Sequence, residues 1–496
     1  MIDQEIQADW HALADEVWLG VAEWRAANPK ATFAEIEQAV EERLATIRTR
    51  VLADVALASA VRDIATQDES ERPRCPDCHG ELEARGQQAR ELTTLRGDTV
   101  RLRRSYSVCG VCGHGLFPLD EELELLPGSL SPSLAEGVAR LGSWMPFVQV
   151  SVVLERLSGA RVSEATARRE TLAAGNALVS LEEKAVTLLE GEAPEPEAGA
   201  PWQQVSVDGA MVPLVGGEWA EARTLVLAAL GCHSGKLQAT GLSYLSRMTD
   251  HATFTRLTTL ATHRQGVEKA RVVLAVNDGA EWIQELLEVQ CPAAIRILDW
   301  AHASGYIHAA GHAVFGEPCG KWCAAQLTTL LTGEPIAVLV ELVRLLDLLG
   351  EDTPARETVS QSLAYLAKRY DQIQYATFTA LGYPIGSGIV ESANKLVVEV
   401  RLKGAGMHWS RSNVNPMLAL RSITCSNRWA ADWPRIAAQR RHTARLQRAR
   451  RHDQRLAQPP SRRPRPPRPP RSIAGRPTEH HPWKRYPAVT PRHAKL

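Results

Sequence analysis

Four cysteines in the first quarter of the chain have the spacing of a metal-binding module. Cys75 and Cys78 form one Cys-x-x-Cys pair, and Cys109 and Cys112 form a second pair. Four thiolates suit a tetrahedral Zn²⁺ ion, and binding of the ion supplies folding free energy to a small module. Disulfides or free thiols are the alternative, and they are less common for this spacing in an intracellular chain. We therefore predict a zinc ribbon within residues 71–120.

Three acidic residues lie at places that apolar packing alone does not explain. Asp208 lies in or at the end of an apolar strand, Asp278 ends another strand, and Glu391 begins a helix after a Gly-Ser-Gly sequence. A buried, unpaired carboxylate is costly, so such a residue tends to be solvated, to cap a helix or to bind a cation. Three converging carboxylates can hold two Mg²⁺ ions about 3.5 to 4 Å apart, the spacing used in phosphoryl transfer.

Each of the three acids also has a plain structural interpretation. Asp208-Gly209 can be a simple turn, and Asp278-Gly279 can be a cap between a strand and a helix. Glu391 can be a first-turn carboxylate that interacts favourably with the helix dipole. The joint arrangement of the three residues favours the metal site over these separate explanations.

The hydrophobic pattern predicts the elements that position the acids. Strands are expected at 204–208, 223–228, 241–245, 271–276 and 294–298. A helix is expected at 252–263, and residues 303–380 are mainly helical, with Leu327, Leu330, Leu331, Val338, Leu342, Leu345 and Leu346 as core. Three strands and a helix followed by apolar strands predict a mixed sheet covered on both faces. The long helical segment at 303–380 is therefore predicted to be an insertion into this domain.

Helices are expected at the N-terminus. Apolar residues recur every three to four positions across 1–66, with a break at Asn28-Pro29. Thr32 and Glu35 have the spacing of a capping box, which predicts the start of a second long helix. Paired helices of this kind more often serve packing or dimerisation than chemistry.

Residues 131–190 form a second helical region, with the pattern of a helix-turn-helix. A helix ends near Gly159, and Ser163 is a suitable N-cap for the next helix, which carries Arg168 and Arg169. In the DNA-binding interpretation this second helix enters a major groove, whereas ordinary helix pairs have a similar pattern. The acidic Pro- and Gly-rich stretch at 191–201 predicts a domain boundary.

Charge is distributed unevenly along the chain. Residues 435–496 contain 18 Lys and Arg but only two acids, although the whole chain has 57 basic and 57 acidic residues. Within this segment, 462–471 is rich in Arg and Pro and cannot form a core. A basic Pro/Arg-rich tail, extended when free, is therefore predicted, either binding a polyanion or simply solvated.

Composition excludes several classes of protein. With 44% apolar residues the chain is too hydrophobic for global disorder, and nine cysteines in 496 residues are too few for a secreted disulfide scaffold. The longest apolar run, 335–350, contains Glu341, Arg344 and Asp347, so it does not suit a bilayer. The first residues lack the basic and apolar blocks of a secretory signal. A cytoplasmic protein is expected.

An ordered set of short motifs carries a resemblance to a known family. The chain resembles ISKra-type insertion-sequence transposases, which are DDE transposases distantly related to the Mutator-like group. The resemblance runs from the N-terminal helices to about residue 433. The motifs are Asp208-Gly209, Asn277-Asp278-Gly279-Ala280-Glu281-Trp282, Asp299-Trp300-Ala301-His302, Gly386-Ser387-Gly388-Ile389-Val390-Glu391-Ser392-Ala393-Asn394-Lys395 and Gly406-Met407-His408-Trp409-Ser410.

The resemblance implies a multidomain α+β protein with an RNase H-like α/β core. The core is expected at 202–302 and 381–434, with the all-helical insertion 303–380 between its two parts. N-terminal helices at 1–70, the zinc ribbon at 71–120 and the helix-turn-helix region at 131–190 precede the core, and the basic tail at 435–496 follows it. In this family Asp208, Asp278 and Glu391 correspond to the acids that bind Mg²⁺ or Mn²⁺.

Further site residues follow from the same resemblance. Asp299 and His302 match an Asp-x-x-His signature and are expected to support catalysis. A helix cap at Asp299 and a packing role for His302 are the structural alternatives. Asp299 also rivals Asp278 as the second metal ligand, because both lie at strand ends.

Several residues near Glu391 are candidates for DNA contact. Asn394 and Lys395 follow Glu391 on one helical face and can position phosphates, with a surface ion pair between Glu391 and Lys395 as the alternative. Arg401, Lys403 and Trp409 combine charge and an aromatic ring for phosphate contact and base stacking. Packing of Trp409 into the core is the competing interpretation.

The resemblance implies metal-dependent cleavage and strand transfer of DNA at element ends. The expected partners are the terminal inverted repeats, target DNA and further copies of the chain in a synaptic complex, in the bacterial cytoplasm near the nucleoid. The expected cofactors are Zn²⁺ and Mg²⁺ or Mn²⁺. A non-catalytic zinc-dependent DNA-binding regulator and a structure-specific nuclease are the alternatives.

Overall fold

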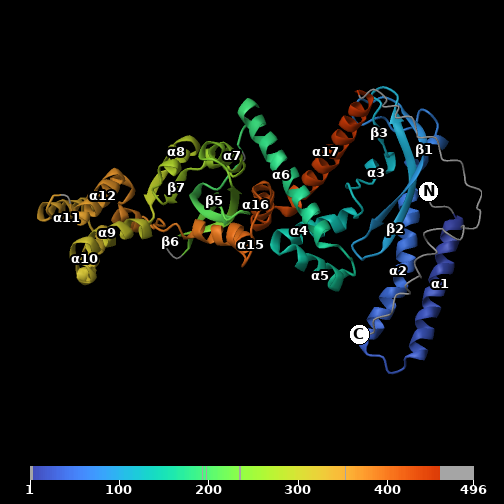
Figure 1. The fold of residues 1–496 in the computed structure, drawn as a ribbon, viewed down its shortest axis with the longest axis horizontal. Coiled ribbons are helices and arrows are strands. Elements are labelled where there is room, and N and C mark those ends of the chain that lie inside the picture. Colours follow the sequence, from blue (N-terminus) through green and yellow to red (C-terminus); the bar gives the residue numbers. More distant parts are fainter. Residues whose placement is uncertain (1–3, 193, 197, 234–235, 352, 458–496) are drawn as a thin grey trace, which may run out of the picture. The chain divides into compact units, whose positions relative to one another are not determined.

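The computed structural model describes residues 4–192, 194–196, 198–233, 236–351 and 353–457. Helices and two separate sheets make up this mixed α and β chain (Figure 1). The described residues divide into two units, one up to residue 446 and one from residue 447 to residue 457. The basic segment predicted at 462–471 lies outside the described residues.

Two long helices begin the chain, as predicted. Helix α1 spans Gln4–Ala27 and α2 spans Phe33–Leu57, and they pack against each other. The capping box is present, since the Thr32 side chain accepts from the Glu35 N–H and the Glu35 carboxylate accepts from the Thr32 N–H. The 3₁₀ turn η1, Ala60–Thr66, follows α2.

The smaller sheet contains the two cysteine pairs. Strands β1 (Leu82–Thr93), β2 (Thr99–Cys109) and β3 (Gly115–Leu116) pair in this order, and both pairings are antiparallel. A small core joins Ile64 of η1 to Leu82 and Leu116, with Cys75 and Cys109 in the same cluster. The other end of the sheet has a separate core, in which Leu92, Val100 and Leu102 pack against residues of α2. At the cysteine end the apolar cluster is small, so a bound ion would contribute to folding there.

A group of helices follows the smaller sheet. Helix α3 spans Pro118–Glu122, α4 Pro132–Trp144, α5 Phe147–Ser158 and α6 Glu164–Glu192. The predicted turn lies between α5 and α6, where Gly159 has φ of 74°, a left-handed conformation that favours glycine. Ser163 caps α6 by accepting a hydrogen bond from the Thr166 N–H at 3.2 Å. The predicted pair of helices and its turn are therefore present.

The larger sheet has five strands in the order β6-β5-β4-β7-β8. They span Lys236–Arg247, Trp219–His233, Trp202–Pro213, Val272–Asn277 and Ile295–Leu298. Strands β4, β5 and β6 are antiparallel neighbours, whereas β4, β7 and β8 run parallel. This mixed sheet contains all five strands that the sequence predicts there.

Helices cover both faces of the larger sheet. On one face, Val205 and Val207 pack with residues of α7 (His251–Arg264) and α8 (Glu281–Gln290). On the other face, Ala210 and Val212 pack with residues of the C-terminal helices. The short turn η2, Val267–Lys269, connects α7 to β7.

The segment predicted as a helical insertion consists of helices joined by short loops. It contains α9 (Trp300–Phe315), η3 (Glu317–Cys319), α10 (Gly320–Thr332), α11 (Pro335–Leu348), α12 (Pro354–Lys368), η4 (Tyr370–Gln372) and α13 (Tyr375–Ala380). The core of this helical block includes all the leucines and the valine predicted for it, and Leu298 of β8 joins the same cluster. We call α9–α13 the helical block.

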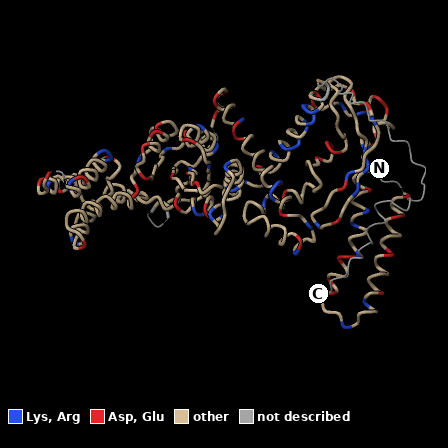
Figure 2. Tube along the Cα trace, viewed as in Figure 1, with Lys and Arg blue, Asp and Glu red and all other residues tan. Residues whose placement is uncertain are grey.

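The C-terminal helices complete the described chain. They are α14 (Gly388–Ala393), the π-helical turn η5 (Asn394–Glu399), α15 (Val400–Leu402), α16 (Arg411–Cys425) and α17 (Trp429–Ala457). Many basic residues lie along α17 (Figure 2). Because α17 continues to residue 457, the first part of the segment predicted as a tail is helical. Within the described ranges, no helix combines the length and apolar character needed to cross a bilayer.

We expect Gly175→Ala to destabilise the fold. A Cβ atom at Gly175 of α6 would lie 2.3 Å from the carbonyl oxygen of Pro416 in α16. Overpacking of this kind costs roughly 1–3 kcal/mol, which exceeds the roughly 0.5–1 kcal/mol that Ala gains over Gly in a helix. The midpoint of thermal unfolding should therefore fall.

Gly191→Ala is the matched control in the same helix. A Cβ atom at Gly191 would meet no heavy atom within 4 Å, so this variant should keep or slightly raise the midpoint. Equal midpoints for the two variants would show that α6 and α16 do not approach as closely as described.

Candidate functional site: four cysteines and a carboxylate cluster

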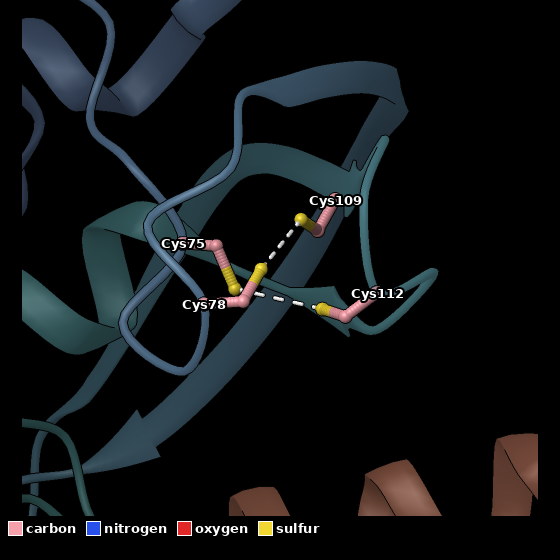
Figure 3. Close-up of side chains that lie close together, drawn as sticks. All are labelled: Cys75, Cys78, Cys109 and Cys112. Carbon is pink, nitrogen blue, oxygen red and sulfur yellow. Dashed lines mark hydrogen bonds between the residues drawn. The ribbon is translucent and has the colours of Figure 1, made fainter.

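The four cysteine thiols converge between the two knuckles of the smaller sheet (Figure 3). Their sulfur atoms all lie within 4.8 Å of one another, with 3.8 Å between Cys75 and Cys112 and 3.4 Å between Cys78 and Cys109. Four sulfurs at the usual Zn–S distance would be about 3.8 Å apart, whereas a disulfide bond is about 2.05 Å long. The cluster can hold a metal ion such as zinc.

Backbone turns direct the thiols of the cluster. The N–H groups of Cys75 and His79 bond across the first knuckle, to Gly80 O and Cys75 O, and His79 has φ of 58°. Burial opposes ionisation of Cys109, but hydrogen bonds from the backbone at Cys112 and Val111 and from Cys78 outweigh it and lower the pKa of Cys109 to about 7. A thiolate at this position is suited to bind a cation.

The first knuckle is also linked to the C-terminal helix. Asp77, between the two cysteines of the pair, lies 3.7 Å from Arg445 of α17, and Arg445 donates to Glu121 at 2.7 Å. His114 Nδ1 lies 3.6 Å from Asp77. His114 therefore lies next to the cysteine cluster and interacts with Asp77, the acidic residue of the first Cys-x-x-Cys pair.

Asp208 lies on β4, and Asp278 directly follows the neighbouring parallel strand β7. Strands β4 and β7 pair as far as Val205 opposite Ala275, and each acid comes three residues after its member of this last pair. Adjacent strands are about 4.8 Å apart. At this end the Asn277 side chain accepts from the Val207 N–H, so a side chain replaces the backbone pairing. The two carboxylates therefore lie just where the ladder ends.

The environment of Asp208 opposes its ionisation. Burial raises the pKa of Asp208, and the negative charge of Asp278 raises it further. The Gly209 N–H donates to Asp208 at 2.7 Å, and together with Asn394 and the charge of His302 it acts in the opposite direction. The net effect is a raised pKa. A cation near both acids would favour their charged forms.

Alternation along β4 places Asp208 on the face covered by the C-terminal helices. Ala210 and Val212 share a face with Asp208 and pack in the same core as Val390 of α14. The Asn394 amide, one turn after Glu391, donates to the Asp208 carboxylate at 2.8 Å. The helix that carries Glu391 therefore lies against the strand that carries Asp208.

Glu391 is exposed and lies in the first turn of α14. In the described chain, the four cysteines are the only group of three or more acidic, histidine or cysteine residues whose ligand atoms all lie within 4.8 Å. Asp208, Asp278 and Glu391 therefore do not form so tight a group. The closest link from this helix to Asp208 is instead Asn394, which is 6% exposed and whose side-chain oxygen has no hydrogen-bond partner.

The turn after Glu391 is held by a buried arginine that the sequence analysis did not identify. Arg421 of α16 donates to the backbone carbonyls of Leu396 and Val397 in η5 and to that of Ser143. Its side chain is fully buried, and burial lowers the pKa of Arg421. A π-helical turn is uncommon and often marks a functional site. Nothing in the local sequence distinguishes Arg421 from a surface arginine.

Asp299 supports the backbone near the acids. Its side chain is 2% exposed, and its two oxygens accept from the Ser387 N–H at 2.7 Å and from the His302 N–H at 3.2 Å. The structural alternative of a helix cap is therefore present, because Asp299 caps α9. Asp299 also fixes the loop that precedes α14, whereas His302 is exposed and acts on Asp208 through its charge.

The predicted DNA-contact residues differ in their exposure. Arg168, Arg169 and Lys395 are exposed, and no ion pair in the described chain joins Glu391 to Lys395. Lys403 is paired with Glu399 at 2.7 Å. Arg168, Arg169 and Lys395 are therefore accessible, whereas Lys403 is only partly exposed and is already paired.

Two of the predicted DNA-contact residues do not reach the surface. Arg401 is 2% exposed and Trp409 is 6% exposed. The Arg401 guanidinium donates to Gly142 O and lies over the rings of Phe147 and Trp409. Burial lowers the pKa of Arg401 to about 10. In this conformation both residues belong to the core, as the competing interpretation of Trp409 stated, and they do not offer a surface for phosphate contact.

Comparisons with known proteins do not identify a family for the chain. A scan against protein-family models finds no match, and a search of curated proteins finds no significant match.

We expect the purified protein to contain one Zn²⁺ ion in the cysteine cluster. Cys109→Ser should abolish the bound zinc and lower the unfolding midpoint, because the ion contributes to folding of the smaller sheet. Zinc content is measured by elemental mass spectrometry. Cys232→Ser is the control, because Cys232 is exposed and lies outside the cluster. Full zinc content in Cys109→Ser would contradict the assignment.

We expect Asp208→Asn to stabilise the protein in buffer without added divalent ions. A folded-state pKa raised above the unfolded value contributes stability at low pH that is lost as pH rises through the folded-state pKa. The Asn variant has no such loss, so its unfolding midpoint should exceed that of the wild type increasingly from acid to neutral pH.

Added Mg²⁺ should raise the midpoint of the wild type more than that of Asp208→Asn. Asp347→Asn, an exposed acid on α11, is the control and should follow the wild type. A constant difference between Asp208→Asn and wild type across the pH range would contradict the electrostatic account.

Proposed function

We propose that the chain is a DNA transposase of an insertion sequence, which cleaves and joins DNA at element ends with a DDE metal site. The observation that carries this proposal is the position of Asp208 on β4 and of Asp278 directly after the parallel neighbour β7, where the charge of Asp278 adds to the burial that opposes the ionisation of Asp208. Such like-charged pairs are unfavourable unless they are neutralised, and they are typical of functional sites. The family resemblance identifies the same two residues.

The topology of the larger sheet supports an RNase H-like core. In the fold that the resemblance implies, the first acid lies on the first strand and the second acid follows the fourth strand. Counted from β4, Asp208 is on the first strand and Asp278 follows β7, the fourth. The helical block lies between β8 and α14, where the resemblance expects an insertion. We accordingly propose core segments at 202–302 and 381–434.

The donor set suits a hard divalent cation. Asp208 and Asp278 offer carboxylate oxygens, and the unpartnered side-chain oxygen of Asn394 lies on the residue that contacts Asp208. Mg²⁺ and Mn²⁺ prefer such oxygen ligands. Two ions held about 3.5 to 4 Å apart need not share every ligand, so the three acids can serve the two ions without all of their ligand atoms lying within 4.8 Å of one another. We propose that Asp208, Asp278 and Glu391 hold the ions.

Each residue of the proposed site has a distinct task. When bound, the metal ions favour the ionised form of the attacking hydroxyl group and neutralise charge on the leaving oxygen. Asn394 holds the Asp208 carboxylate by its amide, and Asp299 fixes the loop before the helix of Glu391. His302 supplies a neighbouring charge when protonated. The chain thus orients its acids without forming a covalent bond to DNA.

DNA recognition is assigned to the N-terminal half and to exposed basic residues. The cysteine cluster and the α5–α6 pair present separate modules, and Arg168 and Arg169 are exposed on α6. Lys395 is exposed next to the proposed site. We propose the terminal inverted repeats and target DNA as partners, with further copies of the chain in the synaptic complex.

We expect Asp208→Asn and Asp278→Asn to reduce DNA cleavage and joining to background, while DNA binding is retained. Each substitution removes a charge that the proposed ions require. The substrate is a duplex that carries the inverted repeats flanking the gene, and products are resolved on a denaturing gel with and without Mg²⁺. Asp347→Asn should behave as wild type, because it changes an exposed acid of α11.

The products separate the candidate functions. Cleavage without joining would indicate a nuclease, and salt-sensitive binding without cleavage would indicate a DNA-binding regulator. Full activity of Asp208→Asn in Mg²⁺ would refute the DDE assignment.

A further inference from the structure

The loop that carries Asp278 is held by two residues of the helical block. The Gly279 N–H donates to the Tyr365 hydroxyl oxygen at 3.3 Å. The Arg369 guanidinium donates to the Gly279 carbonyl through Nε at 3.1 Å and also through Nη2. Both backbone groups of the residue next to Asp278 are therefore bonded to side chains from a segment almost ninety residues later in the chain.

The fit around Gly279 is close. A Cβ atom at Gly279 would lie 2.1 Å from Arg369 Nε and 2.6 Å from the Tyr365 hydroxyl. Arg369 lies over the Tyr365 ring at 3.8 Å, and Tyr365 stacks on Tyr306 with ring centroids 3.9 Å apart. The contact is thus part of the packed core of the helical block and leaves no room for a side chain.

Burial of the charged Arg369 guanidinium is unfavourable in free energy. Its residue is 5% exposed, and Glu281, its acidic partner at 3.3 Å, has a side chain that is 63% exposed. A buried guanidinium loses its hydration, and this loss must be offset by hydrogen bonds and nearby charge. The hydrogen bonds that offset it are those to the loop beside Asp278, together with the Tyr365 carbonyl.

The loop needs support from outside the sheet. Strand β7 ends at Asn277, so Asp278 is beyond the last backbone pairing of the ladder. Its own side chain bonds to the Ala280 N–H at 3.0 Å, a local contact within the loop. Burial raises the pKa of Tyr365 to about 12, so its hydroxyl stays neutral and available to Gly279 near neutral pH.

We propose that Tyr365 and Arg369 are positioning residues for Asp278, through which the helical block sets the affinity of the site for its divalent ions. The inference rests on the proposed metal site. The two residues act on the backbone of the loop and need no contact with metal or DNA. Without these hydrogen bonds the protein would still fold, but the loop after β7 would be more mobile and the Asp278 carboxylate would be held less firmly near Asp208.

The test is the binding of Mn²⁺ to the zinc-loaded full-length chain, followed by electron paramagnetic resonance of the free ion. Tyr365→Phe removes the hydroxyl but keeps the ring and its stacking. We expect the dissociation constant for Mn²⁺ to rise about 10-fold, the lower end of the range for groups that orient metal ligands. Asp278→Asn gives the reference for loss of the ligand itself.

Tyr306→Phe is the matched control. It makes the same chemical change in the ring stacked on Tyr365, but the Tyr306 hydroxyl does not bond to Gly279. Mn²⁺ affinity and thermal stability should match the wild type. Hydrogen exchange of the peptide that covers Gly279 should be faster in Tyr365→Phe alone, since only this variant loses the bond to that N–H.

The outcomes separate this inference from the proposed function. Weaker Mn²⁺ binding and faster exchange in Tyr365→Phe support the positioning role, even if the wild type never joins DNA and the transposase proposal fails. Unchanged Mn²⁺ affinity in Tyr365→Phe overturns the positioning role, even if the wild type is an active transposase. A wild-type chain that binds no Mn²⁺ beyond the Asp278→Asn reference overturns both.

Discussion

The cost of ionising Asp208, which is largely buried and lies near the charge of Asp278, is the constraint that the contacts around the two acids offset in part. Asp208 lies on β4 and Asp278 follows the parallel strand β7, and nearby groups limit this cost. Asn394 donates to Asp208, and Asp278 bonds within its own loop. These contacts do not offset the cost fully, because burial and, to a lesser degree, the charge of Asp278 keep the pKa of Asp208 raised. A site of this kind stores an unfavourable interaction that a bound cation can relieve.

Three separate supports hold backbone segments next to Asp278 and on both sides of Glu391. Arg369 and Tyr365 hold the loop after β7, Asp299 holds the loop before α14, and Arg421 holds the π-helical turn after it. Each support joins a side chain to backbone groups of a distant segment. Backbone groups at the ends of strands and helices lack partners in regular structure, so side chains are needed there. The supports thus come from the end of α12, from the N-cap of α9 and from α16.

Much of the fold follows from local patterns in the sequence. The capping box at Thr32, the turn at Gly159 and the five strands of the larger sheet are signalled by residues close together in the chain, and all are present. The cysteine cluster is equally local in its signal, because each Cys-x-x-Cys pair determines its own turn.

Contacts between distant segments were harder to predict. Arg401 resembles a surface arginine in sequence, and only the packing of Phe147 and Trp409 around it shows that it is buried. Asn394 was expected to contact phosphate, but it bonds to Asp208 across 186 positions of the chain. No sequence pattern indicates the roles of Tyr365, Arg369 and Arg421. Their partners are backbone groups, which every residue type carries, so the partner's residue type gives no signal. The helical segment at 435–457 was missed because its charge outweighed its helical pattern.

The wide turn at Asn394–Glu399 determines the rotational phase of α15, which continues the same helix to Leu402. An α-helix advances by about 100° per residue, so one additional residue in a turn rotates the later side chains by that angle relative to the earlier ones. With this offset, Asn394 faces the sheet while Arg401 faces Gly142 of α4. Deleting a single residue from this turn would direct one of the two side chains away from its partner, whatever the chemical nature of the residue removed.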